Sequence, residues 1–228
     1  MSGQRFRRLV SRTRKLLGLG KRPSAHRDLA ARFTYVYRGR TWKSKESASG
    51  PGSERSSGQV SHALSTLQTV VDRYDIRSMA DVPCGDFNWM PAFLERNPQL
   101  RYAGYDIVKP LVLANRRRHP THRFQRLDIV VEAPEAVDLI FSKDLVNHLL
   151  NADIWKALEN FAASGSTYLL ITSNADAEPD VDLEVNVGGA SRPLSLTISP
   201  FNLPPPLLND GYFCLWRIDD IRIRLADR

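Results

Sequence analysis

The amino-acid sequence predicts an α/β fold built on a doubly wound, mainly parallel sheet, with a basic helical N-terminal arm. Two observations support the prediction of this sheet. Short apolar segments alternate with helical patterns between residues 60 and 173, and acidic residues occur where four of the apolar segments end. Alternating strands and helices form right-handed βαβ units, with helices on both faces of one sheet. The chain has 228 residues, 42% of them hydrophobic, which suits one domain with an appendage.

The N-terminal arm is set apart by its charge. Residues 1–45 hold 14 Lys and Arg and one acidic residue, whereas the remaining 183 residues hold 18 basic and 24 acidic residues. Within residues 4–19, apolar side chains recur at steps of three and four, which predicts a basic amphipathic helix. We expect an arm, residues 1–41, and a domain, residues 42–228, with the boundary placed where the resemblance described below begins.

The remaining elements follow in order along the chain. Helices are predicted at Leu29–Tyr37, Val60–Tyr74, Asn88–Asn97, Leu111–Arg118 and Asp153–Ala163. Strands are predicted at Ile76–Val82, Tyr102–Val108, His122–Ile129, Val137–Ser142 and Thr167–Ser173, with two late strands at Pro193–Ile198 and Gly211–Ile218. A Ser- and Gly-rich stretch, residues 44–58, predicts a loop. Four prolines within residues 199–207 exclude a helix or a central strand there.

Acidic residues end the first four predicted strands: Asp81, Asp106, Asp128 and Asp144. A single acidic residue at such a place is most often a loop or helix-cap residue. Four in succession fit a ligand crevice better, because open α/β sheets bind ligands outside the carboxyl ends of their strands. The pattern indicates a nucleoside site, and the absence of a G-x-G-x-x-G turn argues against a nicotinamide dinucleotide.

The sequence from about Trp42 onward resembles the class I S-adenosylmethionine-dependent methyltransferases, which have a Rossmann-like fold. It is most similar to a little-characterised subgroup with the motif Asp-x-Pro-Cys-Gly-Asp-Phe-x-Trp-Met, which stands here at residues 81–90. The similarity includes residues 46–53 and the proline-rich residues 200–206. It implies transfer of a methyl group from S-adenosyl-L-methionine to an O or N acceptor in a small molecule, glycan or protein. Of the usual three loop glycines only Gly85 is kept, with Pro83 and Phe87 in the flanking positions.

The resemblance also implies a cofactor site. Asp106 would accept hydrogen bonds from both ribose hydroxyls, with Ile107 against the adenine, and Asp128 would contact the adenine amino group. Asp86 would hold the cationic part of the cofactor or cap the following helix, and residues 46–53 would form a lid or a linker. The expected cofactor contacts are Trp42, Ser49, Gly50, Asp81, Pro83, Cys84, Gly85, Asp86, Asp106, Ile107, Asp128, Ile129 and Lys143.

Asp144 and His148 are the candidates for a catalytic base. They are four residues apart, so a helix starting there would place them on one face, and an imidazole titrates near neutral pH. The stretch around His148 resembles a Leu-x-His-Leu element in which the histidine is often structural, so a packing role stays open. Phe201 and Asn202 are candidates for acceptor contacts.

Other features of the sequence limit the possible partners and location. No histidine pairs with Cys84 or Cys214 at metal-ligand spacing, so no metal site is expected. Cysteine usage and the lack of a membrane-span-length apolar stretch favour a cytoplasmic protein. Residues 1–22 suit an anionic membrane surface, which would make the protein peripheral; nucleic acid ranks lower because aromatic residues are few, and a solvated tail is the third possibility. The alternative to an enzyme is a non-catalytic nucleoside-binding or interaction module, which the basic arm would anchor to a membrane surface or to nucleic acid.

Overall fold

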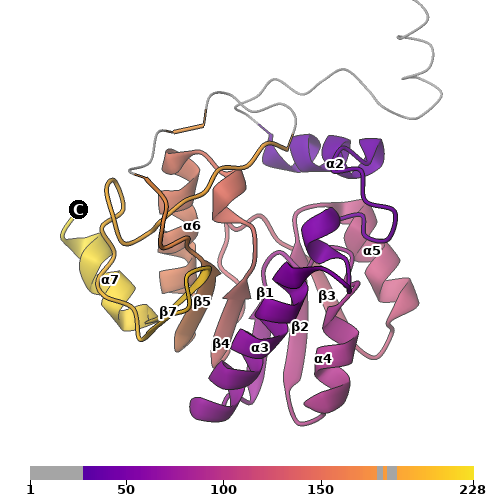
Figure 1. Cartoon of the computed structure of the whole chain (residues 1–228), viewed down its shortest axis with the longest axis horizontal. Helices are drawn as coiled ribbons and strands as arrows, with labels where there is room; N and C mark the ends of the chain where they lie inside the picture. The colour runs from indigo at the N-terminus through magenta and orange to yellow at the C-terminus, as the bar shows by residue number, and fades with distance from the viewer. Residues whose placement is uncertain (1–27, 179–181, 184–188) are drawn as a thin grey trace, which may run out of the picture.

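The computed structural model describes residues 28–178, 182–183 and 189–228, so the helix expected at residues 4–19 lies outside the described part of the chain. One sheet of seven strands runs through the domain in the order β3-β2-β1-β4-β5-β7-β6 (Figure 1). The strands are β1 (Ser78–Asp81), β2 (Arg101–Asp106), β3 (Arg123–Arg126), β4 (Leu139–Ser142), β5 (Tyr168–Thr172), β6 (Leu208–Asn209) and β7 (Phe213–Arg217). Strands β1 to β5 are parallel, β7 is antiparallel to β5, and β6 is antiparallel to β7. The predicted doubly wound, mainly parallel sheet is confirmed.

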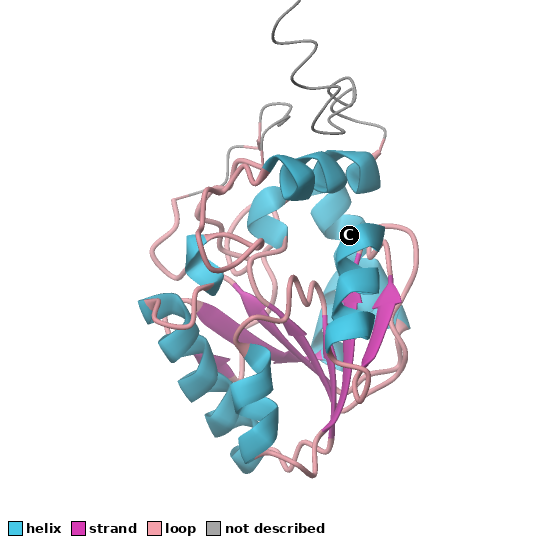
Figure 2. Ribbon diagram, turned by 90° about the vertical axis from the view of Figure 1, so that its right-hand side faces the viewer, coloured by secondary structure: helices cyan, strands magenta, loops and turns pink. Residues whose placement is uncertain are grey.

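Helices cover both faces of the sheet, as Figure 2 shows. They are α2 (Leu29–Gly39), α3 (Gly58–Arg73), α4 (Met90–Arg96), α5 (Lys109–Arg118), α6 (Asn151–Ala163) and α7 (Ile218–Ala226), with 3₁₀ turns η1 (Pro51–Ser53) and η2 (Val146–His148). Neighbouring strand residues point to opposite faces: Met79 packs in the core with α3 and α4, and Ala80 in the core with α6 and α7. No helix of the described residues is both long enough and apolar enough to cross a membrane.

Local capping explains where two of the helices begin. The Ser57 side chain accepts a hydrogen bond from the Val60 amide at the start of α3, and Asp28 accepts one from the Ala31 amide at the start of α2. Helix α4 begins at Met90, two residues later than predicted, with Pro91 in its first turn.

In the C-terminal third, one prediction is wrong and two elements were not predicted. Residues Pro193–Ile198 form no strand: the Leu196 and Leu194 amides donate to side-chain oxygens, Ser173 Oγ and Asn174 Oδ1, and the carbonyls of these two leucines accept from the Leu203 and Asn174 amides. Helix α7 was not predicted, although Ile218 and Ile221 repeat at helical spacing and are buried. The short strand β6 was not predicted either; it pairs only with β7.

Candidate functional site

A cavity of about 400 Å³ lies at the carboxyl ends of β1, β2 and β4. Helix α2, which lies at the top of the molecule in Figure 1, lines the cavity on one side, and residues 48–53 line another. Phe33 and Tyr37 of α2 line the cavity, and the sequence interpretation missed both. Their spacing of four residues was the available signal, since it places two aromatic side chains on one helical face.

Gly85 forms the turn that follows β1 and is held from two sides. Its amide donates to Asp106 Oδ2 at 3.2 Å, and its carbonyl accepts from Asn115 Nδ2 at 2.8 Å. The residue has φ of 53°, and a Cβ placed on it would lie 2.3 Å from Ser49 Oγ. Only glycine fits this turn without displacing Ser49, and Gly85 lines the cavity with that side chain packed against its Cα.

Two buried carboxylates lie side by side at the floor of the cavity. Asp106 accepts from the Val108 amide at 2.8 Å in addition to Gly85, and Asp81 accepts from the Tyr102 hydroxyl at 2.8 Å. Only 7% of Asp106 and 3% of Asp81 is exposed. Burial raises the pKa of Asp81 to about 8 and that of Asp106 to about 6. Removal from water disfavours the charged carboxylates, so a cation in the cavity would stabilise them.

Replacing Asp81 with asparagine is expected to stabilise the protein above about pH 8 by roughly 1–3 kcal/mol. The amide oxygen can still accept from Tyr102, but it carries no buried charge. A carboxyl whose pKa is raised on folding stabilises the folded state while it is protonated. This contribution is lost as the pH rises from 3.8, the ordinary pKa of an aspartate, through about 8, the pKa of Asp81 in the fold. Urea unfolding near pH 5 and above pH 8 measures the effect, with the exposed Asp219→Asn as control. A difference from wild type that does not grow with pH would contradict it.

Residues 46–53 are folded against the Gly85 turn through Asp86. The Asp86 carboxylate accepts from the Ala48 amide at 2.6 Å, the Ser47 hydroxyl at 3.0 Å and the Ser49 hydroxyl at 3.3 Å, and the Asp86 amide donates to Ser49 Oγ at 3.0 Å. These hydrogen bonds hold the segment in place as one side of the cavity. The alternative that Asp86 caps the next helix is wrong, because α4 begins at Met90 without a side-chain cap.

Lys143 and Asp144 follow β4, and the buried Lys143 and the half-buried Asp144 form a polar cluster. The Lys143 ammonium binds Asp144 Oδ2 and donates to the Gly52 carbonyl at 3.2 Å, and Tyr212 donates to Asp144 Oδ1. Both carboxylate oxygens of Asp144 are thus engaged, which suits a counter-ion for Lys143 better than a proton acceptor. The expected shared helical face of Asp144 and His148 is wrong: Asp144 has φ of 55°, and only residues 146–148 form a 3₁₀ turn.

His148 lines the cavity and is oriented by a carbonyl. Its Nδ1 lies 2.9 Å from the Ala190 oxygen. Because a carbonyl only accepts, the proton sits on Nδ1, and Nε2 keeps its lone pair. Burial lowers the pKa of His148, so the ring is neutral at pH 7. The Trp42 ring lies 5.4 Å from the imidazole between centroids, and Trp42 Nε1 donates to Gly189 O at 2.9 Å.

Most of the predicted contacts surround the cavity. Eleven line it, namely Trp42, Ser49, Gly50, Asp81, Pro83, Cys84, Gly85, Asp86, Asp106, Ile107 and Lys143. Cys84 and Cys214 are buried thiols, and burial raises the pKa of both. Across the described ranges, no three His, Cys, Asp or Glu side chains are grouped to hold a metal.

Four predicted site residues lie away from the cavity lining. Strand β3 ends at Arg126, and the chain then turns toward α6, where Asn160 Nδ2 donates to the Ile129 carbonyl at 2.6 Å. Asp128 accepts from the Val130 amide within that turn, so neither Asp128 nor Ile129 reaches the cavity. Phe201 is fully buried against Trp155, and Asn202 is exposed to solvent. The acceptor contacts assigned to Phe201 and Asn202 are therefore corrected.

Comparisons with known proteins gave structural matches only. No family model and no curated protein matches the chain. The N-methyltransferase NodS from Bradyrhizobium japonicum, solved with S-adenosyl-L-homocysteine, is 16% identical over 63% of this chain and 74% of its own, with a TM-score of 0.49. CalS10, an amino pentose methyltransferase from Micromonospora echinaspora solved with bound cofactor, is 20% identical over 55% of this chain and 56% of its own, with a TM-score of 0.45. The chain spans 65% of the methyltransferase domain of bacterial CtHen1 and 56% of LaPhzM, less than two thirds of either. At these scores the similarity carries no functional assignment, and the function proposed below rests on the site itself.

Proposed function

We propose that this protein is an S-adenosylmethionine-dependent methyltransferase acting on an O or N acceptor, of the subgroup with the motif at residues 81–90. The observation that supports it is the pair of buried carboxylates, Asp81 and Asp106, beside the Gly85 turn in one cavity. A small molecule, a glycan or a protein side chain can each present such an acceptor.

The cavity residues fit this cofactor by their chemistry. S-adenosylmethionine carries a sulfonium and an ammonium, and the acidic floor favours cations. Each Asp106 oxygen uses one lone pair on an amide, which leaves acceptor capacity for a ribose diol. Ile107, Val108 and Leu111 provide an apolar wall for the purine ring.

The protein's own residues then account for the reaction. When bound, the cofactor supplies an already activated methyl group. Asp106 and the Gly85 turn hold the nucleoside, while Phe33, Tyr37 and Trp42 keep water from the reaction centre. His148 takes the acceptor proton on Nε2, and the Ala190 carbonyl keeps the ring in the required tautomer.

Isothermal titration of the protein with S-adenosylmethionine tests the proposal. We expect saturable binding, with NAD giving none because the chain lacks a dinucleotide turn. No binding at about 1 mM cofactor, roughly the weakest affinity a dedicated site shows, would contradict the proposal. Binding without methyl incorporation into any lysate fraction, read by mass spectrometry, would favour the non-catalytic nucleoside-binding module.

A further inference from the structure

Outside the cavity, the molecule has a positively charged surface formed by α5, the end of α2 and the residues that follow α2, with α2 and α5 in contact. Between Asp28 and Glu46 the chain has five basic residues and no acidic one; between Asp106 and Asp128 it has six and none. Ten of these eleven side chains are exposed, and one of the ten, Arg123, pairs with Glu135. Seven of the others define the basic surface: Arg38, Arg40, Lys43, Lys45, Lys109, Arg117 and Arg118.

The cations of the basic surface have no acidic partners within the described residues, since none of the seven makes an ion pair there. Elsewhere on the molecule, exposed basic residues are commonly paired, as in Arg77 with Asp75 and Arg222 with Asp219. Like charges gathered without counter-charges repel one another, so an anionic partner would relieve the repulsion.

The chemistry of the surface favours a lipid bilayer over a nucleic acid. Leu113 is 40% exposed and lies between Lys109 and Arg117 on the outer stripe of α5, at steps of four. An apolar side chain ringed by cations suits the boundary between lipid headgroups and acyl chains. Bases require exposed aromatic rings for stacking, but Phe33 and Tyr37 of α2 line the cavity.

We propose that the basic surface docks on anionic lipid membranes, with Leu113 at the headgroup boundary. Its charge continues that of residues 1–27, the first part of the arm, which contain nine Lys and Arg and precede the Asp28 cap of α2. Because α2 also covers the cavity, docking brings the cavity roof to the lipid surface. This interaction needs neither the cofactor nor methyl transfer.

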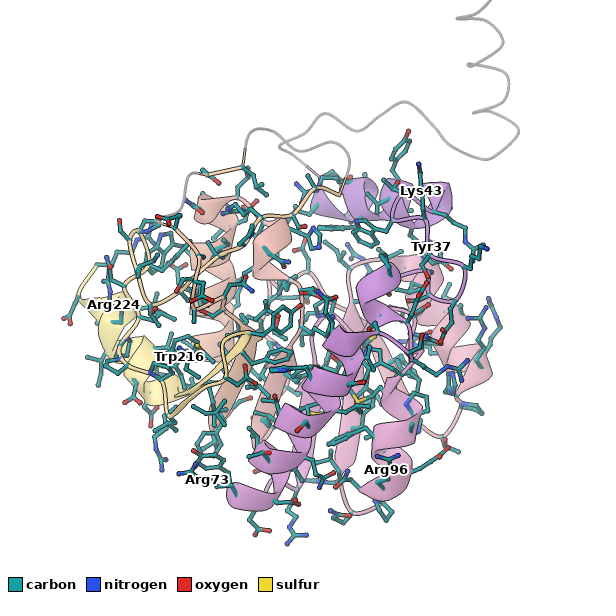
Figure 3. The ribbon with its side chains drawn as sticks, viewed as in Figure 1. Tyr37, Lys43, Arg73, Arg96, Trp216 and Arg224 are labelled. Carbon is teal, nitrogen blue, oxygen red and sulfur yellow. The ribbon has the colours of Figure 1, made fainter. Side chains whose placement is uncertain are left out.

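Charge reversal in two matched positions tests the proposal with the full chain. Arg38 and Arg117 lie in the last turns of α2 and α5, and Arg73 and Arg96 lie in the last turns of α3 and α4. Lys43 marks the α2 end of the molecule in Figure 3, and Arg73 and Arg96 lie at the opposite end. The variant Arg38→Glu/Arg117→Glu and the control Arg73→Glu/Arg96→Glu therefore make the same charge change in the last turns of two helices, within the basic surface and outside it.

Sedimentation with phosphatidylcholine vesicles, with and without about 30 mol% phosphatidylserine, is the measurement. We expect binding of wild type and control only to the anionic vesicles, and at least roughly 10-fold weaker binding of the Arg38→Glu/Arg117→Glu variant. If that variant does not fold, Arg38→Gln/Arg117→Gln should show a smaller loss in the same direction. Equal binding by variant and control, no wild-type binding to anionic vesicles, or binding of RNA or duplex DNA in place of vesicles would overturn the proposal.

Discussion

Replacing Asp106 with alanine is expected to weaken the binding of S-adenosylmethionine by about 100-fold or more. A carboxylate that accepts from both hydroxyls of a ribose makes two charge-assisted hydrogen bonds, each contributing roughly 1.5–3 kcal/mol. The substitution also frees the Gly85 and Val108 amides that the carboxylate holds. Isothermal titration measures the affinity, and thermal unfolding separates lost binding from lost folding.

Asp128→Ala is the control for the Asp106 substitution. Both acidic residues follow strands of the same sheet, but Asp128 accepts from its own turn and does not line the cavity. Its removal should leave the affinity for the cofactor within about threefold of wild type, as for other substitutions away from a site. Equal losses in the two variants would mean that Asp106 acts only through the fold.

Replacing His148 with alanine is expected to lower the rate of methyl transfer by about 100- to 10,000-fold, the range of general base catalysis. Affinity for the cofactor should stay within a few-fold of wild type, because Asp106 and Gly85 provide those contacts. Methyl incorporation from labelled cofactor into a responsive lysate fraction measures the rate, and titration measures the affinity. His62→Ala, at an exposed histidine paired with Asp210 outside the cavity, is the control.

The pH profile separates a base from a packing residue. Burial lowers the pKa of His148, so the neutral form persists to more acidic pH than for an ordinary histidine, whose pKa is 6.5. The wild-type rate should therefore be level near pH 7 and fall only below about 6.5. A packing role predicts that His148→Ala lowers the unfolding temperature and the cofactor affinity together, with an unchanged profile for the residual rate.

The acidic residues at the strand ends show how far sequence patterns reach. Asp81, Asp106 and Asp144 were expected to meet because parallel strands end at one edge of a sheet, and they do line one cavity. Asp128 also follows a strand, yet it does not line the cavity. Strand β3 ends at Arg126 rather than at Ile129, and the turn after it is hydrogen-bonded to α6. A strand pattern reports direction and order but not the path of the loop that follows.

The role of Asp86 shows the same limit from another side. The sequence suggested that Asp86 either contacts the cationic part of the cofactor or caps the next helix. Both roles involve groups close to Asp86 in the sequence or in the expected cofactor site. The structure places its carboxylate on residues 47–49, almost forty positions away. Such a contact depends on how residues 46–53 fold over the sheet edge, and nothing in the local sequence encodes the distance between them.

The sequence by itself determined the α/β class, the parallel core and the glycine turn at the end of β1, because apolar periodicity and positive-φ glycine are local properties. It also separated the basic arm from an acidic domain, since charge is additive along the chain. Only the tertiary structure decided that α2 covers the cavity and that Asp144 is engaged by Lys143 and Tyr212. It likewise decided that α2 contacts α5, which brings the cations at the end of α2 and just after it toward those of α5. These depend on packing between segments far apart in the chain, where burial and geometry rather than neighbouring residues choose each partner.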